Sequence, residues 1–357
     1  MINKAETANN FYNKNLEYSQ LAYEKDNMLP HRYVLVLTNL CNLACTFCFQ
    51  DRKKNPNRMN FEDWKKFINE IPENSRITLT GGEPLVFKEF DELFKLCSKK
   101  AETNIVSNGL LLDEKKINLF LNEKNFKVLG VSIDTIGNTN RDFKPGEWEK
   151  LVKSIQDFKI ERDKVGHQCA IDIKTVVLDE NIDDLFEIHK YCFEVLGADT
   201  HSLQLLKGSE IQHSDLMFDD DSMHKKYNAE QYKKFDELIN QLNRIREYNF
   251  KYKKRGYLHP NIIDLNSDIE INLDEYSFLN NSDHDVKKFK TCLSPWTSVH
   301  VNVDGSLFPC MAIPMGNVKK QPLNEIFFSE KFKYFRDEIR KKKTLNGCNR
   351  CGWLKAT

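Results

Sequence analysis

The sequence predicts an α/β fold, a partial (β/α)6 parallel barrel followed by a small C-terminal domain of a β-hairpin, helices and clustered cysteines. Two observations carry this prediction. From residue 32 onward, short β-rich runs alternate with amphipathic segments, which is the pattern of repeated βα units. The alternation ends after residue 208, and beyond residue 290 a hairpin pattern lies among four cysteines. Six βα units with right-handed crossovers predict an open, curved sheet with helices outside, rather than a closed barrel of eight.

The chain of 357 residues divides into four predicted parts. Residues 1–31 form a polar N-terminal leader segment, irregular apart from a short helix around residues 12–23, that packs over the core. Residues 32–208 form the (β/α)6 core. Residues 209–290 form a helical insert or linker that could cover the barrel mouth, and residues 291–357 form the C-terminal domain.

Six buried strands are expected in the core, each rich in β-branched or aromatic residues. They span Tyr33–Leu37, Arg76–Thr80, Thr103–Ser107, Val128–Ile133, Ala170–Val177 and Ser202–Leu206. Between them, apolar residues recur at helical spacing after Asn60, Asp113, Gly146 and Asn181 and over Phe90–Cys97. Asn60 is a good N-cap residue. In the predicted insert, a longer helix follows Tyr232.

Charge and composition exclude several classes of partner. Lysine plus arginine equals aspartate plus glutamate at 53 each, so no overall field attracts nucleic acid or an anionic membrane. No apolar run approaches the roughly 20 residues that a membrane span needs, and the N-terminus lacks a signal-peptide core. We therefore expect a cytoplasmic protein with no nucleic-acid or membrane partner. In a reducing compartment, clustered cysteines indicate metal binding rather than disulfides.

Three cysteines follow the first strand closely. Cys41, Cys45 and Cys48 have the spacing CxxxCxxC. Three thiolates in one loop can hold three irons of a four-iron cluster, which leaves the fourth iron open. A zinc loop and three buried cysteines are the alternatives, but no fourth Cys or His follows soon after Cys48 to close a zinc tetrahedron.

Polar groups also follow the next three strands. Gly81-Gly82-Glu83-Pro84 comes after the second strand and Ser107-Asn108-Gly109 after the third, while Ser132 and Asp134 flank the end of the fourth. Each motif alone is typical of a turn. Together they supply polar groups to one rim of the barrel, the edge at which parallel sheets bind ligands.

The order, spacing and rim position of these motifs resemble the radical S-adenosylmethionine (radical SAM) enzymes over residues 32–208. The resemblance implies a [4Fe-4S] cluster whose open iron binds the amino and carboxylate groups of S-adenosylmethionine. It also implies these cofactor contacts: Phe47 at the aromatic position of the cysteine loop, the Gly81-Gly82 backbone and Glu83 on the methionyl amino group, Ser107 and Asn108 near the ribose or the methionine carboxylate, and Ser132 or Asp134 in support. Departures are Thr135, where many relatives have glycine, and the sixth strand, which ends without the proline often found there. The adenine contact is therefore left open.

A second cysteine set lies in the C-terminal part. Cys292 and Cys310 flank Gly305 in the arrangement CX12GX4C, and Cys348 and Cys351 form a CxxC. This arrangement resembles the twitch domain, the shortened form of the SPASM domain of radical SAM enzymes. Four thiolates saturate one [4Fe-4S] cluster or one tetrahedral zinc. With the upstream motifs we expect an auxiliary iron–sulfur cluster, structural or electron-relaying, with no iron left for substrate.

The resemblance implies a radical SAM oxidoreductase. An electron from a donor such as flavodoxin or ferredoxin would cleave S-adenosylmethionine, and the 5′-deoxyadenosyl radical would abstract a substrate hydrogen. We expect net oxidation of a small polar metabolite, such as a sugar, aminocyclitol or nucleotide-linked intermediate, because the first 30 residues are too short for a leader-peptide-binding domain.

Two alternatives stay open. The first is an enzyme that modifies a peptide by crosslinking, oxidation or epimerisation, for which the insert could form a groove. Cys169 is the one scattered cysteine outside the predicted helices and a weak candidate to return a hydrogen atom, although it starts a strand and is more typical of buried structure. The second is a non-catalytic electron carrier or zinc scaffold, which would not need the GGEP and SNG motifs.

Overall fold

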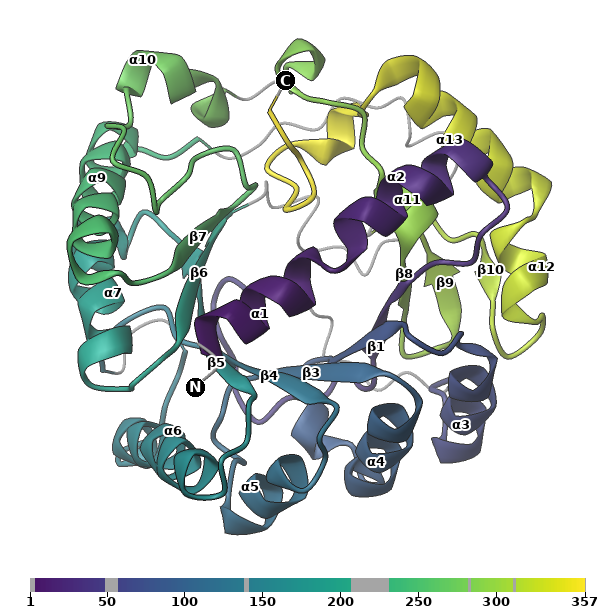
Figure 1. Cartoon of the computed structure of the whole chain (residues 1–357), viewed down its shortest axis with the longest axis horizontal. Coiled ribbons are helices and arrows are strands. Elements are labelled where there is room, and N and C mark those ends of the chain that lie inside the picture. Colours follow the sequence, from purple (N-terminus) through teal and green to yellow (C-terminus); the bar gives the residue numbers. More distant parts are fainter. Residues whose placement is uncertain are drawn as a thin grey trace.

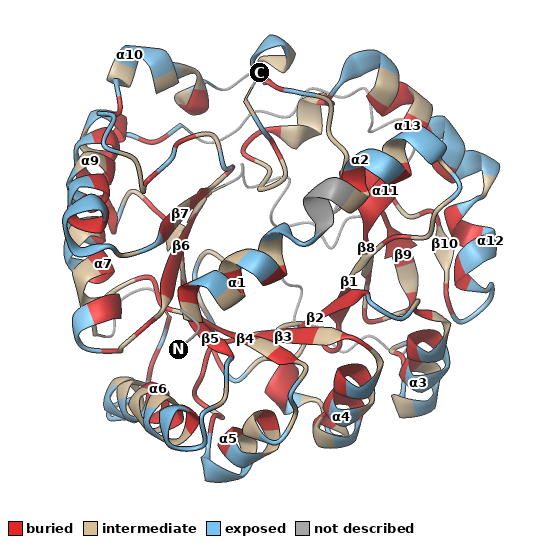
Figure 2. Ribbon diagram, in the orientation of Figure 1, coloured by how far each residue is buried: buried red, intermediate tan, exposed pale blue. Residues whose placement is uncertain are grey.

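The computed structural model of the chain describes residues 4–48, 57–137, 141–206, 231–281, 284–310 and 313–356, without the side chains of 15–17. Its strands form one curved sheet, and most helices lie outside the sheet (Figure 1). Buried residues face inward from these helices, whereas their outer faces are exposed (Figure 2). This arrangement confirms the predicted α/β fold with a partial parallel barrel.

All six predicted strands are present, with ends within two residues of those expected. They are β1 Arg32–Val36, β2 Arg76–Thr80, β3 Glu102–Ser107, β4 Phe126–Ser132, β5 Ala170–Val177 and β6 Thr200–Leu205. Each pairs in parallel with the next. The strands are near-continuous buried runs, as expected when a sheet contacts other parts of the chain on both faces.

The sheet extends beyond the six predicted strands at both edges. β7 (Gly256–His259) pairs in parallel with β6, and β8 (Ser298–Val301) pairs in parallel with β1. β8 also forms the predicted antiparallel hairpin with β9 (Ser306–Phe308), which pairs with β10 (Gly316–Asn317). The order of the described strands is β10-β9-β8-β1-β2-β3-β4-β5-β6-β7, so β10 and β7 are the edge strands and the sheet is open between them. β7 lies within residues 209–290, which were predicted to be a helical insert or linker, so the strand was not expected there.

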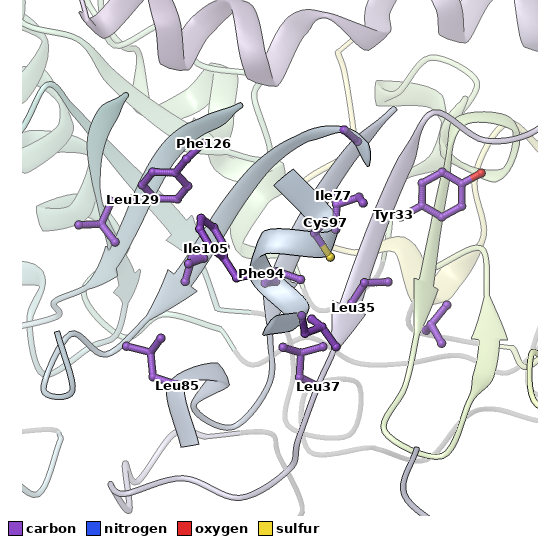
Figure 3. Packing of buried hydrophobic residues seen from close by; sticks show 14 of the residues in the cluster. Tyr33, Leu35, Leu37, Ile77, Leu85, Phe94, Cys97, Ile105, Phe126 and Leu129 are labelled. Carbon is purple, nitrogen blue, oxygen red and sulfur yellow. The ribbon is translucent and has the colours of Figure 1, made fainter. Parts of the chain in front are cut away.

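The predicted core helices form at the expected places. They are α3 Phe61–Glu70, α4 Phe90–Lys100, α5 Glu114–Leu121, α6 Glu147–Lys164 and α7 Leu185–Glu194, with the longer α9 at Phe235–Tyr252. The Asn60 side chain accepts a hydrogen bond from the Asp63 amide, 2.9 Å away, which confirms the N-cap. Apolar residues of α4 pack against the sheet. Among them, Cys97 is fully buried beside Phe94 and Ile77 (Figure 3).

The N-terminal segment differs from the prediction, because it forms two helices rather than one. α1 (Lys4–Asn13) crosses the amino ends of β4 and β5, and α2 (Asn15–Lys25) continues beside the C-terminal part (Figure 1). Ala8 and Phe11 of α1 are buried against Val128 of β4 and Ala170 of β5. Because most residues of α1 are polar, its short apolar stripe is difficult to recognise in the sequence.

The remaining elements are short, apart from the C-terminal helix α13. They are η1 Pro84–Val86, η2 Ile182–Asp184, α10 Leu273–Tyr276, η4 Ser277–Asn280, η5 Val286–Lys288, α11 Ser294–Thr297, α12 Leu323–Phe327, α13 Glu330–Lys342 and η6 Asn346–Cys348. No helix in the described ranges combines the length and the apolar character that crossing a membrane requires. The predicted boundary at residues 208 and 209 lies outside the described residues, and the four-part division stays a prediction.

Candidate active site

Two loops at the carboxyl ends of β1 and β2 are in backbone contact. The Gly82 amide donates to the Thr38 carbonyl at 2.6 Å, and the Glu83 amide donates to the Leu40 carbonyl at 2.9 Å. A Cβ atom on Gly81 or Gly82 would stand 2.4 Å from one of these carbonyl oxygens. Both glycines are therefore required by the close approach of the GGEP loop to the segment that leads into Cys41.

Glu83 joins the GGEP loop to the SNG loop. Its side chain is fully buried, and its carboxylate accepts hydrogen bonds from the Ser107 hydroxyl (2.8 Å), the Asn108 amide (2.7 Å) and the Leu85 amide (3.1 Å). Burial raises the pKa of Glu83 to about 7, against the effect of these bonds. A carboxylate has about four acceptor positions, and these three donors of the described residues occupy three of them.

Asn108 brings the SNG loop to the cysteine loop. Its side-chain amide donates to the side-chain oxygen Oδ1 of Asn42 at 2.8 Å and lies 3.7 Å from the Cys41 sulfur. The Leu43 amide also points at this sulfur, at 3.4 Å. Three predicted motifs are thus joined in one hydrogen-bonded group at the rim.

Arg141 is a member of this group that the sequence did not reveal. Its guanidinium pairs with the fully buried Asp134, lies 4.0 Å from the Cys45 sulfur and stands 5.6 Å from the centre of the Phe47 ring. Burial raises the pKa of Cys45, and the charge of Arg141 opposes that rise. A buried carboxylate at a strand end requires a cation, and Arg141 is the first basic residue after Asp134.

Ser132 and Asp134, the two supporting residues predicted at the end of β4, have different surroundings. Asp134 is held by Arg141 and accepts a hydrogen bond from the Val176 amide at 2.7 Å, so its role is to support the rim. Ser132 is partly exposed and is the register partner of Lys174 in β5. Ser132 is the more accessible of the two for a ligand.

The four C-terminal cysteines come together from three places in the chain. Cys292 precedes α11, Cys310 follows β9, and Cys348 and Cys351 follow α13. Burial raises the pKa of Cys292 well above its ordinary value, and the thiols of Cys348, Cys351 and Cys310 contribute to this rise. The four sulfurs therefore lie in one neighbourhood.

Both cysteine sets fit iron–sulfur groups by the chemistry of their donors. No group of three or more Cys, His, Asp or Glu side chains in the described part of the chain is arranged to hold one metal ion. Each set nevertheless gathers thiols alone, which are the ligands of [4Fe-4S] clusters. The Arg141 guanidinium and the Asn108 amide beside the first set suit the negative charge of thiolate ligands.

Cys169 lies apart from both sets. Its side chain is fully buried in the core between the sheet and the helices, just before the amino end of β5, and burial raises the pKa of its thiol to about 12. This position accords with buried structure and not with a hydrogen donor at the opposite, carboxyl rim.

Two family models match the chain. The model of the radical SAM superfamily matches residues 35–192, and the model of the SPASM iron–sulfur cluster-binding domain matches residues 292–352. The second match is to SPASM and does not specify the shortened twitch form. The cysteine loop, the rim motifs and the C-terminal cysteines all lie within the matched ranges.

Similar proteins include two curated relatives. The sporulation killing factor maturation protein SkfB of Bacillus subtilis is 29% identical over 176 residues, which span 47% of this chain and 40% of SkfB. An uncharacterized protein of Methanocaldococcus jannaschii is 30% identical over 235 residues, spanning 62% of this chain and 74% of that protein. This chain thus covers less than half of the length of SkfB.

Solved structures share the fold at low sequence identity. Streptococcus suis SuiB bound to the precursor peptide SuiA is 17% identical, with a TM-score of 0.61 over 95% of this chain and 75% of SuiB. The protein anSMEcpe with bound AdoMet and the Kp18Cys peptide is 19% identical, with a TM-score of 0.60 over 92% of this chain and 93% of that chain.

Proposed function

The chain belongs to the radical SAM superfamily, with a C-terminal SPASM iron–sulfur domain, and from this premise we propose that Cys41, Cys45 and Cys48 hold the cluster to which S-adenosylmethionine binds. The observation that carries this proposal is the hydrogen-bonded group in which Glu83 and Asn108 tie the GGEP and SNG loops to the cysteine loop. The chain is accordingly an enzyme.

The residues of the rim have distinct proposed roles. When bound, the cluster supplies the electron that cleaves S-adenosylmethionine to methionine and a 5′-deoxyadenosyl radical, which takes a hydrogen atom from the substrate. Glu83 keeps one acceptor position for the methionyl amino group. Arg141 offers positive charge beside the cysteine loop, and the partly exposed Ser132 offers a hydroxyl to the ligand. A donor such as flavodoxin or ferredoxin would supply the electron.

For the second set, we propose one auxiliary [4Fe-4S] cluster on Cys292, Cys310, Cys348 and Cys351, as in the twitch form. The influence of the other three thiols on the pKa of Cys292 supports this set, because it places the sulfurs together. Four thiolates leave no iron open, so the cluster would accept or relay electrons without binding substrate. This arrangement suits a net oxidation.

The proposed substrate is a peptide. SkfB is by name a maturation protein of a killing factor, and the SuiB and anSMEcpe structures contain peptides. These findings favour the peptide alternative over the small polar metabolite that the sequence led us to expect.

The decisive experiment is the anaerobic reaction of the reconstituted protein with S-adenosylmethionine and dithionite. Mass spectrometry should detect 5′-deoxyadenosine, and addition of the correct peptide should give a product lighter by two hydrogens, if the reaction is an oxidation. Absence of 5′-deoxyadenosine from protein with a full iron content would refute the proposal. Turnover of a small metabolite but of no peptide would restore the original expectation.

A further inference from the structure

The inner face of the sheet carries two neighbouring arginines at the amino ends of its strands. Arg32 of β1 and Arg76 of β2 are register partners on adjacent parallel strands, so their side chains lie on the same face. Tyr33 and Ile77, the next residues, belong to the core between the sheet and the outer helices. The arginines therefore point to the inner side. Arg76 is 4% exposed and Arg32 is partly exposed.

Neither arginine has a carboxylate partner in the described part of the chain. Arg32 donates to the Ser298 hydroxyl at 2.9 Å and lies 5.2 Å from the centre of the Trp353 ring. Arg76 donates to the Phe11 carbonyl at 2.8 Å, and its Nε is buried without a hydrogen-bond partner. Their contacts are thus a hydroxyl, a carbonyl and aromatic rings, none of which carries a negative charge.

The acidic side chains near the two arginines form ion pairs with other cations. Asp172 of β5 pairs with Lys174 at 2.6 Å. Glu102, the register partner of Arg76 on β3, pairs with Lys14 at 2.9 Å. After these pairs are counted, no carboxylate of the described residues forms an ion pair with Arg32 or Arg76, although the charge of Glu102 acts on Arg76 and that of Cys351 on Arg32.

This excess of charge is unfavourable in the protein as it stands. Burial lowers the pKa of Arg32 to about 10 and that of Arg76 to about 9, and the charge of Arg32 contributes to the second shift. Both groups stay cationic at neutral pH. A buried charge without an ion-pair partner is unfavourable, and an arriving counter-ion removes that cost.

We propose that Arg32 and Arg76 bind an oxyanion group of the substrate, a carboxylate or a phosphate. Guanidinium groups present planar pairs of N–H donors that match both oxyanions, and the free Nε of Arg76 supplies one such donor. An acidic peptide and a phosphorylated metabolite offer the same chemistry to this pair. The indole of Trp353 lies over Arg32 and would report the arrival of an anion.

The position of the arginines, taken together with the proposed function, also describes the shape of the substrate. β1 has Arg32 at its amino end and leads to the cysteine loop at its other end. Five residues of parallel strand span about 16 Å. A substrate anchored by the arginines would be extended, with its anionic group at the end opposite to the abstracted hydrogen.

The test is calorimetric titration of the reconstituted holoprotein with inorganic phosphate and, separately, with glutarate, followed in parallel by tryptophan fluorescence. We expect saturable binding of at least one anion, weakened about tenfold or more by Arg32→Gln or Arg76→Gln. Arg76→Lys should retain part of the affinity, which separates loss of charge from loss of folding. Lys115→Gln is the matched control, since Lys115 is an 80% exposed cation on the outer helix α5.

Tighter binding of phosphate would identify a phosphorylated substrate, and tighter binding of glutarate a carboxylate of a peptide; each supports the site. No saturable binding, or equal weakening by Lys115→Gln, overturns it. Formation of 5′-deoxyadenosine without substrate should persist in the arginine variants. Its absence from the wild type would refute the proposed function while the anion titrations still decide this site.

Discussion

The two cysteine sets are built in opposite ways. Cys41, Cys45 and Cys48 lie within eight residues of one loop, and their neighbours come from the next strand ends of the same sheet. The second set comes from segments up to 59 residues apart and consists of Cys292, Cys310, Cys348 and Cys351. The first set is therefore placed by local sequence, whereas the second depends on long-range packing.

The supports of the second set show this dependence. Arg350, between Cys348 and Cys351, is 1% exposed and donates to the carbonyls of Leu279 (2.9 Å) and Leu206 (2.8 Å). One side chain thus ties the CxxC to the end of β6 and to the segment after α10. A local loop can bind a ligand and release it without disturbing the fold, but a set assembled in this way is part of the fold.

The largest expected effect is the loss of S-adenosylmethionine cleavage in Cys41→Ala. Removal of one of three thiolates should lower 5′-deoxyadenosine formation by about 100-fold or more, because the cluster loses an iron ligand. The iron of the C-terminal set should remain, at about four per chain. Cys97→Ala, in the core, is the control and should retain cleavage. If Cys41→Ala cleaved S-adenosylmethionine at the wild-type rate, the first cysteine set would not be the site of cleavage, and its contrast with the second set would be wrong.

The second expected effect separates cleavage from product formation. In Cys348→Ala, iron should fall from about eight to about four per chain, and the oxidised product should be lost. Formation of 5′-deoxyadenosine should stay within a few-fold of the wild type, because the rim is untouched. Iron analysis and mass spectrometry would measure both. Stoichiometric zinc in the wild type would contradict the assignment of this set.

The third prediction concerns Arg350. Arg350→Met leaves buried carbonyl oxygens without donors, so we expect the free energy of unfolding to fall by about 3 kcal/mol, together with early loss of the second set of iron atoms. Urea denaturation with iron analysis checks this. Arg244→Met, on the outer face of α9, is the control and should change stability by less than about 0.5 kcal/mol. An equal loss of stability in Arg350→Met and Arg244→Met would mean that the CxxC does not depend on the packing of Arg350.

The smallest expected effect is a pH dependence at the first set. The pKa of Glu83 is raised to about 7, so its folded state binds a proton that the unfolded state releases near pH 4.5. Its contribution to stability is complete below about pH 4.5 and is lost as pH rises to about 7, by at most about 1.4 kcal/mol per pH unit. Urea denaturation of the apoprotein should show this slope in the wild type. Parallel curves for the wild type and Glu83→Gln would contradict it.

The sequence predicted the strands and the rim because both are local. A buried strand such as Tyr33–Leu37 is a continuous apolar run, and the GGEP turn follows its strand directly. β7 and Arg141 were missed for a shared reason, because each has a partner that is distant in sequence: β7 pairs with β6, and Arg141 lies beside Cys45, 96 residues earlier in the chain. The metal-ligand and cofactor roles of the predicted residues stay predictions.

The parallel pairing of β8 with β1 has a consequence for synthesis of the chain. Arg32 and Ser298 are register partners, and 266 residues separate them in sequence. While the ribosome makes the chain, the edge of β1 that pairs with β8 stays unpaired until β8 has been synthesised. Exposed strand edges promote aggregation, and contacts of such high sequence separation form slowly. A nascent chain that stalls before residue 298 would therefore be an early client of chaperones.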